Sequence, residues 1–163
     1  MGPMLRVRRI GPDDAEQLRE TRLAALLDTP SAFARTHAEE SAYPTEEWAF
    51  RARRGSEGDA SATFFAELDG SVVGLVGGYR PDGALVELVS MWVAPAGRRN
   101  GVGAALVDAV VDWSGADAVE LWVTRGNDPA IALYERCGFV TTDEVQPLPS
   151  DPCKDEIRMR LER

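Results

Sequence analysis

The pattern of apolar and polar positions changes period several times along the chain, and each period predicts an element. Apolar residues that alternate with polar ones predict half-buried strands, and apolar residues three and four apart predict amphipathic helices. Short alternating or β-rich runs predict about seven strands, over residues 5–10, 62–70, 71–80, 84–95, 118–124, 139–145 and 155–163. The helical spacing predicts about four helices, over residues 11–27, 44–55, 103–114 and 127–138.

Turn residues separate these elements and set their order. Asp69-Gly70 lies between two β-rich runs, which is a strong hairpin signal, and residues 81–83 (PDG) turn the chain again. Residues 146–152 (QPLPSDP) predict a proline-rich loop before the last strand. The order βααβββαβαββ predicts an α+β fold, in which helices cover the faces of a mixed sheet. We expect residues 1–163 to form one domain.

Residues 93–106 (VAPAGRRNGVGAAL) combine glycines and arginines at the start of a predicted helix. Gly101 and Gly103 remove side chains where a helix exposes unpaired N–H groups, and such a helix end attracts anions. Arg98 and Arg99 add positive charge beside it. A dinucleotide fingerprint would need a third glycine where Leu106 stands, and a P-loop would need a lysine. A tight turn without a ligand is the alternative to a pyrophosphate cradle.

Two motifs at the expected spacing resemble those of the GNAT superfamily, the acyl-CoA-dependent N-acyltransferases. Residues 87–103 are similar to its motif A, a strand followed by an Arg/Gln-x-x-Gly-x-Gly/Ala turn and a helix; the turn here is RRNGVG. Downstream, Asn127 follows a strand, Tyr134 lies in the next helix, and Gly138-Phe139 starts another strand. Gly97 departs from the family pattern, in which this position often has a larger residue. We therefore expect the turn to be looser in this chain.

The resemblance implies a GNAT-like fold, with a mostly antiparallel central sheet, and acetyl-CoA as co-substrate. It places the pyrophosphate on the backbone N–H groups of residues 99–104. It places the pantetheine arm against the exposed backbone of the preceding strand, whose side chains would also serve the core. The residues that it assigns to acetyl-CoA binding are Met91, Trp92, Val93, Arg98, Arg99, Asn100, Gly101, Val102, Gly103, Ala104, Asn127, Ala130 and Tyr134.

The resemblance also suggests catalytic residues. Glu87 matches the position of the general-base glutamate of some relatives; a solvated strand residue is the alternative, with Glu120 or ordered water as other bases. Tyr134 matches a tyrosine placed near the CoA sulfur, although it would also fit a core position. Proton transfer from a tyrosine to a thiolate is uphill by about 2 kcal/mol in water, so a hydrogen bond to the sulfur is equally consistent. Asn127 contacts the pantetheine, caps its helix, or does both.

Composition limits the classes of partner and cofactor that we expect this protein to bind. The net charge of −9 disfavours nucleic-acid binding, and one histidine with two scattered cysteines does not form a metal site. The sequence has neither a long apolar run nor a secretory signal, so we expect a cytoplasmic protein without membrane association. A homodimer formed through the final strands stays an open expectation.

The acceptor is less well defined than the donor. By resemblance, it binds to residues 26–48 and 142–157, where aromatic side chains mix with carboxylates. This mixture suits a cationic amine, a small molecule or a peptide amine, and a solvated acidic surface explains the charges equally well. We therefore expect transfer of an acetyl group from acetyl-CoA to a primary amine. The alternative is a non-catalytic acyl-CoA sensor, whereas an NAD-dependent oxidoreductase is disfavoured.

Overall fold

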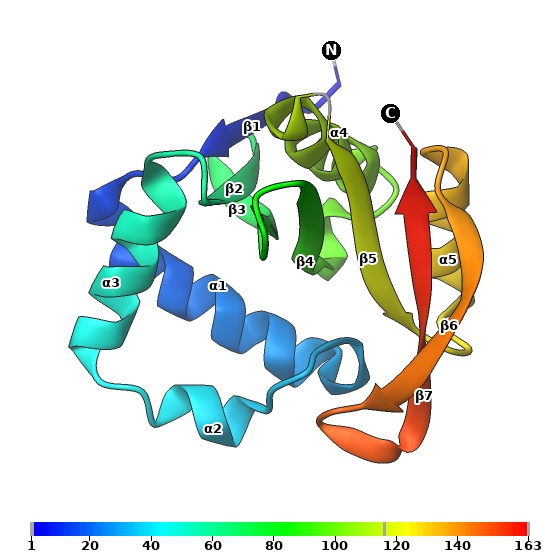
Figure 1. The fold of residues 1–163 in the computed structure, drawn as a ribbon. Helices are drawn as coiled ribbons and strands as arrows, with labels where there is room; N and C mark the ends of the chain where they lie inside the picture. Colours follow the sequence, from blue (N-terminus) through cyan, green and yellow to red (C-terminus); the bar gives the residue numbers. More distant parts are fainter. Residues whose placement is uncertain (1, 116, 163) are drawn as a thin grey trace.

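The computed structural model describes residues 2–115 and 117–162, which form one seven-stranded sheet with helices on both faces (Figure 1). The strands are β1 (Leu5–Arg9), β2 (Ser61–Leu68), β3 (Ser71–Tyr79), β4 (Leu85–Val93), β5 (Ala118–Thr124), β6 (Val140–Leu148) and β7 (Asp151–Leu161). The α-helices are α1 (Ala15–Asp28), α2 (His37–Ser41), α3 (Thr45–Ser56), α4 (Val102–Ser114) and α5 (Asp128–Arg136). Short 3-10 helices span Pro12–Asp14, Pro30–Ala32 and Pro95–Gly97.

The sheet has the strand order β1-β2-β3-β4-β5-β7-β6. Every neighbouring pair is antiparallel except β4 and β5, which run parallel. Sequential strands form the antiparallel pairs β1–β2, β2–β3, β3–β4 and β6–β7, and α4 provides the crossover between the parallel pair. The predicted fold class, a mixed and mostly antiparallel sheet flanked by helices, is confirmed.

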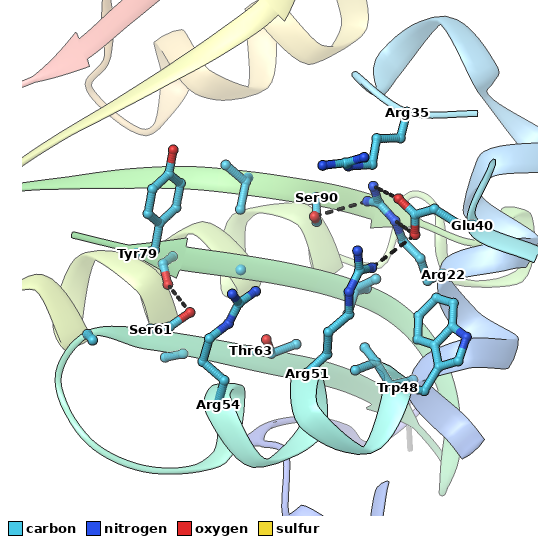
Figure 2. A pocket seen from close by; sticks show the side chains of 17 residues that line it. Arg22, Arg35, Glu40, Trp48, Arg51, Arg54, Ser61, Thr63, Tyr79 and Ser90 are labelled. Atoms are coloured by element: carbon cyan, nitrogen blue, oxygen red, sulfur yellow. Dashed lines mark hydrogen bonds and ion pairs between the residues drawn. The ribbon is translucent and has the colours of Figure 1, made fainter. Parts of the chain in front are cut away.

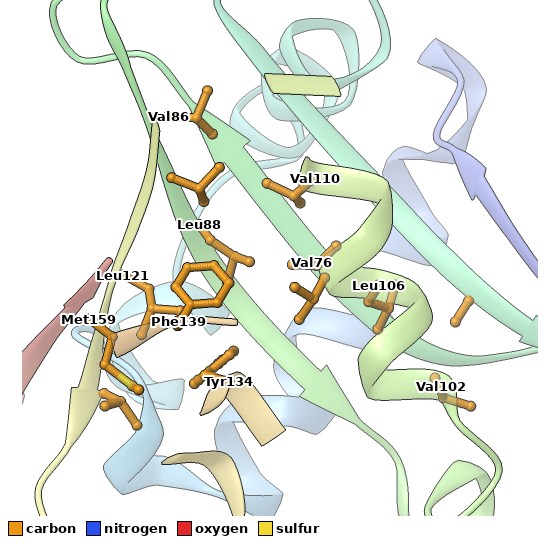
Figure 3. Close-up of a cluster of buried hydrophobic side chains, with 14 of the residues drawn as sticks. Val76, Val86, Leu88, Val102, Leu106, Val110, Leu121, Tyr134, Phe139 and Met159 are labelled. Carbon is orange, nitrogen blue, oxygen red and sulfur yellow. The ribbon is translucent and has the colours of Figure 1, made fainter. Parts of the chain in front are cut away.

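Two glycines in β3 allow α4 to lie close to the sheet. A Cβ atom at Gly74 would lie 3.0 Å from Leu106 Cδ1, and one at Gly78 would lie 3.1 Å from Val110 Cγ1. The apolar face of α4 therefore packs directly on the strands, together with α5, and forms the main core (Figure 3). Full burial of Leu106 and Val110 stabilises this contact by about 1.5–3 kcal/mol per side chain.

The parallel pair β4–β5 separates after three residues. Leu85–Glu87 pair with Ala118–Glu120, but β4 continues to Val93 and β5 to Thr124 with no further pairing between them. A bulge bends β4 at this point: one extra residue lies between the partners of Gly77 and Leu75, and Ser90 has a φ of 60°. The two strands diverge toward their carboxyl ends, as Figure 1 shows, and expose strand backbone inside the sheet.

The structure differs from the sequence prediction at two places. The chain between the first two predicted helices contains an additional short helix, α2, whose first turn is closed by a capping box between Thr36 and Glu39. The predicted loop over residues 146–152 is wrong, since β6 and β7 extend through it and leave only a tight turn. Its prolines are tolerated because β6 is an edge strand and Pro152 lies before the point where β7 meets β5.

Candidate active site

The turn before α4 presents a row of free backbone donors. Within the described residues, no acceptor is bonded to the N–H groups of residues 99–104, and the first internal bond of the helix comes from Ala105 to Gly101. Arg99, with a φ of 68°, and Gly101, with a φ of 74°, adopt the left-handed conformation. Six consecutive unbonded amides therefore lie at the positive end of a 13-residue helix, an arrangement that suits an anion.

Glycine occupies three positions of this turn for different physical reasons. A Cβ at Gly101 would have open space around it, with no contact within 4 Å, so the positive φ of this residue is what requires glycine. At Gly103 a Cβ would lie 2.9 Å from Leu133 Cδ2, so glycine there lets α5 pack against α4. At Gly97 a Cβ would lie 2.9 Å from Val73 Cβ and Cγ2. The turn at Gly97 therefore packs tightly on β3, which differs from the looser turn expected from the sequence.

The two arginines of the turn lie in different environments. Arg98 forms an ion pair with Asp28, and its Nε donates to the carbonyl oxygen of Val93 at 3.0 Å. The hydrogen bond from Trp92 and the guanidinium of Arg98 hold the pKa of Asp28 below its usual range. Arg98 thus ties the turn to α1 and to the end of β4. Arg99 is exposed and has no ion-pair partner in the described ranges, so its charge is available to a bound anion.

The strand residues Met91, Trp92 and Val93 form one wall of the gap between β4 and β5. Their side chains belong to the core or border it: Trp92 is buried and donates from Nε1 to Asp28 at 3.0 Å, whereas Met91 and Val93 pack against the main cluster. Their backbone on the β5 side has no strand partner. The predicted backbone contact with a ligand is therefore compatible with a structural role for the side chains.

Tyr134 projects from α5 into the main core close to this gap (Figure 3). Its ring meets the ring of Phe139 edge-on, with 5.9 Å between the centroids. Burial raises the pKa of Tyr134 above its ordinary value, with a smaller contribution from Cys137. No hydrogen bond to the hydroxyl is formed within residues 2–115 and 117–162, so this group has an unused donor. Ala130 is half-buried on the same helix.

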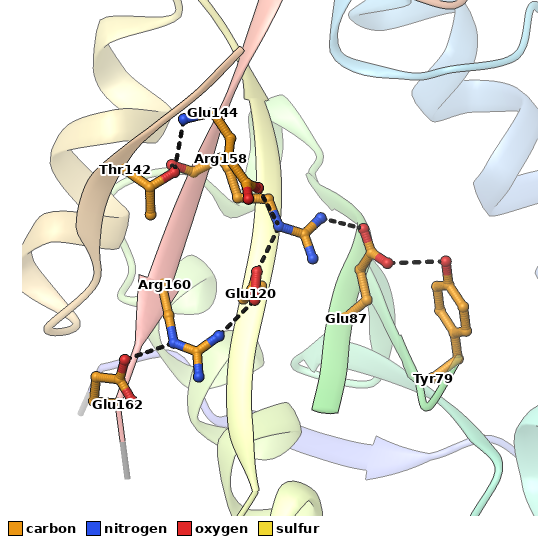
Figure 4. A network of polar contacts seen from close by, with 8 residues as sticks. All are labelled: Tyr79, Glu87, Glu120, Thr142, Glu144, Arg158, Arg160 and Glu162. Carbon is orange, nitrogen blue, oxygen red and sulfur yellow. Dashed lines mark hydrogen bonds and ion pairs between the residues drawn. The ribbon is translucent and has the colours of Figure 1, made fainter. Parts of the chain in front are cut away.

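The carboxylates predicted as bases lie in an ion-pair network at the point where β4 and β5 separate (Figure 4). Glu87 accepts from Tyr79 at 3.0 Å and from Arg158 at 2.9 Å. Arg158 also donates to Glu120 at 2.6 Å, and Glu120 accepts from Arg160 at 2.6 Å. Burial alone would lower the pKa of Arg158, but its contacts with the two glutamates raise it. Glu87 is neither solvated nor free, since each of its oxygens has a donor.

Glu156 is a candidate base that the sequence pattern did not single out. It is buried on β7 opposite Thr124 of β5 and accepts from Gln146 at 2.5 Å, and no arginine among residues 2–115 and 117–162 is bonded to it. Burial raises the pKa of Glu156, and the nearby charge of Glu87 raises it further. The alternation of the last strand does place Glu156 with Arg158 on one polar face, but no spacing rule separates it from its solvated neighbours.

Asn127 caps α5 by accepting from the Ala130 N–H at 3.4 Å. This confirms the capping role, and a contact with the pantetheine stays a prediction. Asn127 also lines a cavity of about 550 Å³, together with Thr124 and Lys154.

Several of the carboxylates and aromatic rings expected to hold a cationic acceptor are already engaged with arginines. Glu40 is fully buried between Arg22 and Arg51. Arg22 stacks on Phe33 at 4.7 Å, and Arg51 stacks on the ring of Tyr43 at 4.7 Å. These contacts do not favour the cationic acceptor, which stays a prediction.

Two further observations concern the described residues only. None of the helices there is long and apolar enough to cross a membrane. The same ranges hold no group of three or more His, Cys, Asp or Glu side chains that could ligate a metal ion.

Comparisons with known proteins agree with this geometry. Residues 22–139 match the Acetyltransferase (GNAT) family. Mycothiol acetyltransferase from Beutenbergia cavernae is 34% identical over 140 residues, which are 82% of this chain and 44% of that protein. The protein YqkA from Bacillus subtilis is 32% identical over 82 residues, 42% of this chain and 24% of that protein. The chain thus spans less than half the length of these curated relatives.

Solved structures share the fold. A GNAT acetyltransferase from Streptococcus pneumoniae superposes with a TM-score of 0.76 at 20% identity, covering 96% of this chain and 98% of that one. The protein yncA from Salmonella typhimurium, solved with its cofactor acetyl-CoA, superposes with a TM-score of 0.78 at 21% identity, covering 98% and 94%. At this identity the likeness establishes the fold alone.

Proposed function

The chain belongs to the Acetyltransferase (GNAT) family, and from this premise we propose that it transfers the acetyl group of acetyl-CoA to a primary amine. The observation that carries the proposal is the row of unbonded N–H groups over residues 99–104, next to the gap between β4 and β5. The first feature suits a pyrophosphate and the second suits an extended, amide-containing arm. Arg99 supplements the cradle, whereas Arg98 supports it from behind.

In the proposed reaction a neutral amine attacks the thioester carbonyl, a C–N bond forms and the C–S bond breaks. Tyr134 donates a hydrogen bond to the leaving sulfur. Because burial raises its pKa, the phenol stays protonated, and full transfer of its proton to a thiolate becomes costlier than in water. A hydrogen bond that stabilises the thiolate therefore fits the site better than proton donation.

The amine must lose a proton to a base or to water. We retain Glu87 as the base proposed from the sequence, because it lies where the two strands separate. Both of its oxygens already accept hydrogen bonds, from Tyr79 and Arg158, so the amine would compete with these donors for the carboxylate. Glu156 is a second candidate, favoured by its raised pKa and by having no bonded arginine.

Calorimetric titration with acetyl-CoA tests the cradle. Gly101→Ala places a Cβ on a left-handed residue at the start of α4. Gly115→Ala, where φ is 64° and ψ is −118°, is the control, because it strains the backbone at the other end of the same helix. We expect the first variant to weaken acetyl-CoA binding about 10-fold, a loss of about 1.4 kcal/mol, and the second to leave it unchanged. NAD should bind to neither protein. Equal effects of the two substitutions would refute the proposed position of the pyrophosphate.

A further inference from the structure

A cavity of about 460 Å³ lies between helices α1–α3 and strands β2–β4 (Figure 2). This volume is within the range of small-molecule sites. The charged side chains that line it are four arginines and one glutamate, and they are Arg22, Arg35, Glu40, Arg51 and Arg54. A basic cavity is unexpected in a chain whose net charge is −9.

Two of these arginines are neutralised by carboxylates. Arg22 grips Glu40 with two bonds, at 3.0 Å from Nε to Oε1 and at 2.9 Å from Nη2 to Oε2. Arg51 donates to the same carboxylate at 3.1 Å and to Glu47 at 3.1 Å. Glu40 is completely buried, and a buried carboxylate is stable only when it is paired. It therefore holds these two guanidinium groups in place.

The other two arginines have no such partner. Within the described ranges, no carboxylate oxygen lies within 4.0 Å of the Arg35 or Arg54 guanidinium. The guanidinium carbon of Arg54 lies 5.5 Å from the centroid of the Phe50 ring. Figure 2 shows Arg35 and Arg54 on different sides of the cavity, Arg35 near Ser90 and Arg54 above β2. Two charges without counter-ions line a cavity whose other charges are paired.

We propose that the acceptor amine carries an oxyanion, a carboxylate or a phosphoryl group, which binds to Arg35 and Arg54. This inference rests on the proposed acetyl transfer and names its substrate class. Guanidinium groups are well matched to both kinds of oxyanion. The cavity also reaches β4 at Val89 and Ser90, beside the gap where the thioester would lie. An anionic group held at the arginines would leave the amine of the same molecule directed toward that gap.

Matched pairs of amines test the proposal by their rates of thiol release from acetyl-CoA. The panel pairs each of the common amino acids with its amide, and O-phosphoethanolamine with ethanolamine, and it includes spermidine as a cation. We expect the member that carries the carboxylate or phosphoryl group to have a kcat/KM at least 10-fold above that of its partner without this group. The amino-acid and phosphate arms distinguish the two oxyanions. The proposal is overturned if spermidine, or the partner that lacks the oxyanion, is acetylated as efficiently as the member that carries it.

Variants connect the preference to the cavity. Arg35→Gln and Arg54→Gln should each raise KM for the anionic amine about 10- to 100-fold with little change in kcat, because each removes a charge-assisted contact. Arg53→Gln is the matched control, because Arg53 is exposed on the same helix and does not line the cavity. If Arg53→Gln has the same effect as Arg54→Gln, the contact is general electrostatics and the proposal fails.

A binding measurement separates this proposal from the proposed function. The same amines are titrated calorimetrically into the protein saturated with CoA, which cannot donate an acetyl group. Tighter binding of the anionic members, lost in the double variant of Arg35 and Arg54, supports the cavity assignment even if no amine is acetylated. Equal binding of both members, or no binding of any anionic member, overturns it even if acetylation of another amine confirms the proposed function.

Discussion

Replacement of Arg158 by methionine removes the cation that joins β4 to β5 where the two strands separate. Arg158 bonds Glu87 at 2.9 Å and Glu120 at 2.6 Å, and these three side chains are only 11–13% exposed. Methionine keeps the length of the side chain and its contact with the ring of Trp122, over which the guanidinium lies at 4.9 Å. The variant therefore isolates the charge, and two register-paired carboxylates are left facing each other.

The expected loss follows from what each glutamate retains. Removal of one partner from a buried ion pair costs about 3–5 kcal/mol. Here Glu120 keeps its bond with Arg160 and Glu87 keeps that with Tyr79, so we expect a smaller loss, about 2–3 kcal/mol. For a chain of this size, that corresponds to a fall in Tm of about 4–12 °C.

Urea unfolding at pH 7.5, followed by far-UV circular dichroism, measures the loss in free energy of unfolding. Arg160→Met is the control, because Arg160 is 36% exposed and Glu120 would still have Arg158. The additional substitution Glu120→Gln in the Arg158→Met background should recover part of the stability at pH 7.5. A loss below about 0.5 kcal/mol, or an equal loss in Arg160→Met, would refute the view that this network holds the strands together at the start of the gap.

The remaining predictions concern the catalytic residues and one buried acid. Tyr134→Phe should lower kcat on the order of 100-fold and leave KM for acetyl-CoA unchanged, and an unchanged kcat would remove Tyr134 from the mechanism. Between Glu87→Gln and Glu156→Gln, the variant that removes the base should lose the dependence of kcat/KM on pH; if both keep it, neither carboxylate is the base. Because burial raises the pKa of Glu156 in the folded protein, its ionisation destabilises the fold above that pKa, and the penalty vanishes below the unfolded value of about 4.3. Glu156→Gln should therefore raise Tm at pH 8 and not at pH 4, and a Tm gain that is independent of pH would contradict this assignment.

The donor side of the site could be predicted from the sequence because its signals are local. Pro95, Gly101 and the apolar run after them mark the end of a strand, a left-handed residue and the start of a helix within about a dozen positions. The free N–H groups follow from that local geometry. The position of Glu87 within its strand could be predicted in the same way.

The acceptor side could not be predicted, because its contacts are between distant segments. Arg22 and Arg51 come from different helices and meet at Glu40. No pattern in the sequence shows that these arginines pair with the Glu40 carboxylate and stack on the neighbouring aromatic rings. Likewise, Glu87 looked available as a base until the structure placed Arg158, 71 positions away, against it. The extension of β6 past Pro147 depends on β6 being at the sheet edge, a fact of topology that local propensity does not contain.

The central claim is that the site made by α4 and the gap between β4 and β5 transfers an acetyl group to an amine. The most direct test incubates the protein with acetyl-CoA that carries a deuterated acetyl group and with the amine panel, and identifies the products by mass spectrometry. We predict an amide that contains the labelled acetyl group, formed at a rate that falls in Tyr134→Phe. Saturable binding of acetyl-CoA without a labelled amide from any amine would contradict the claim and would indicate a sensor of acyl-CoA.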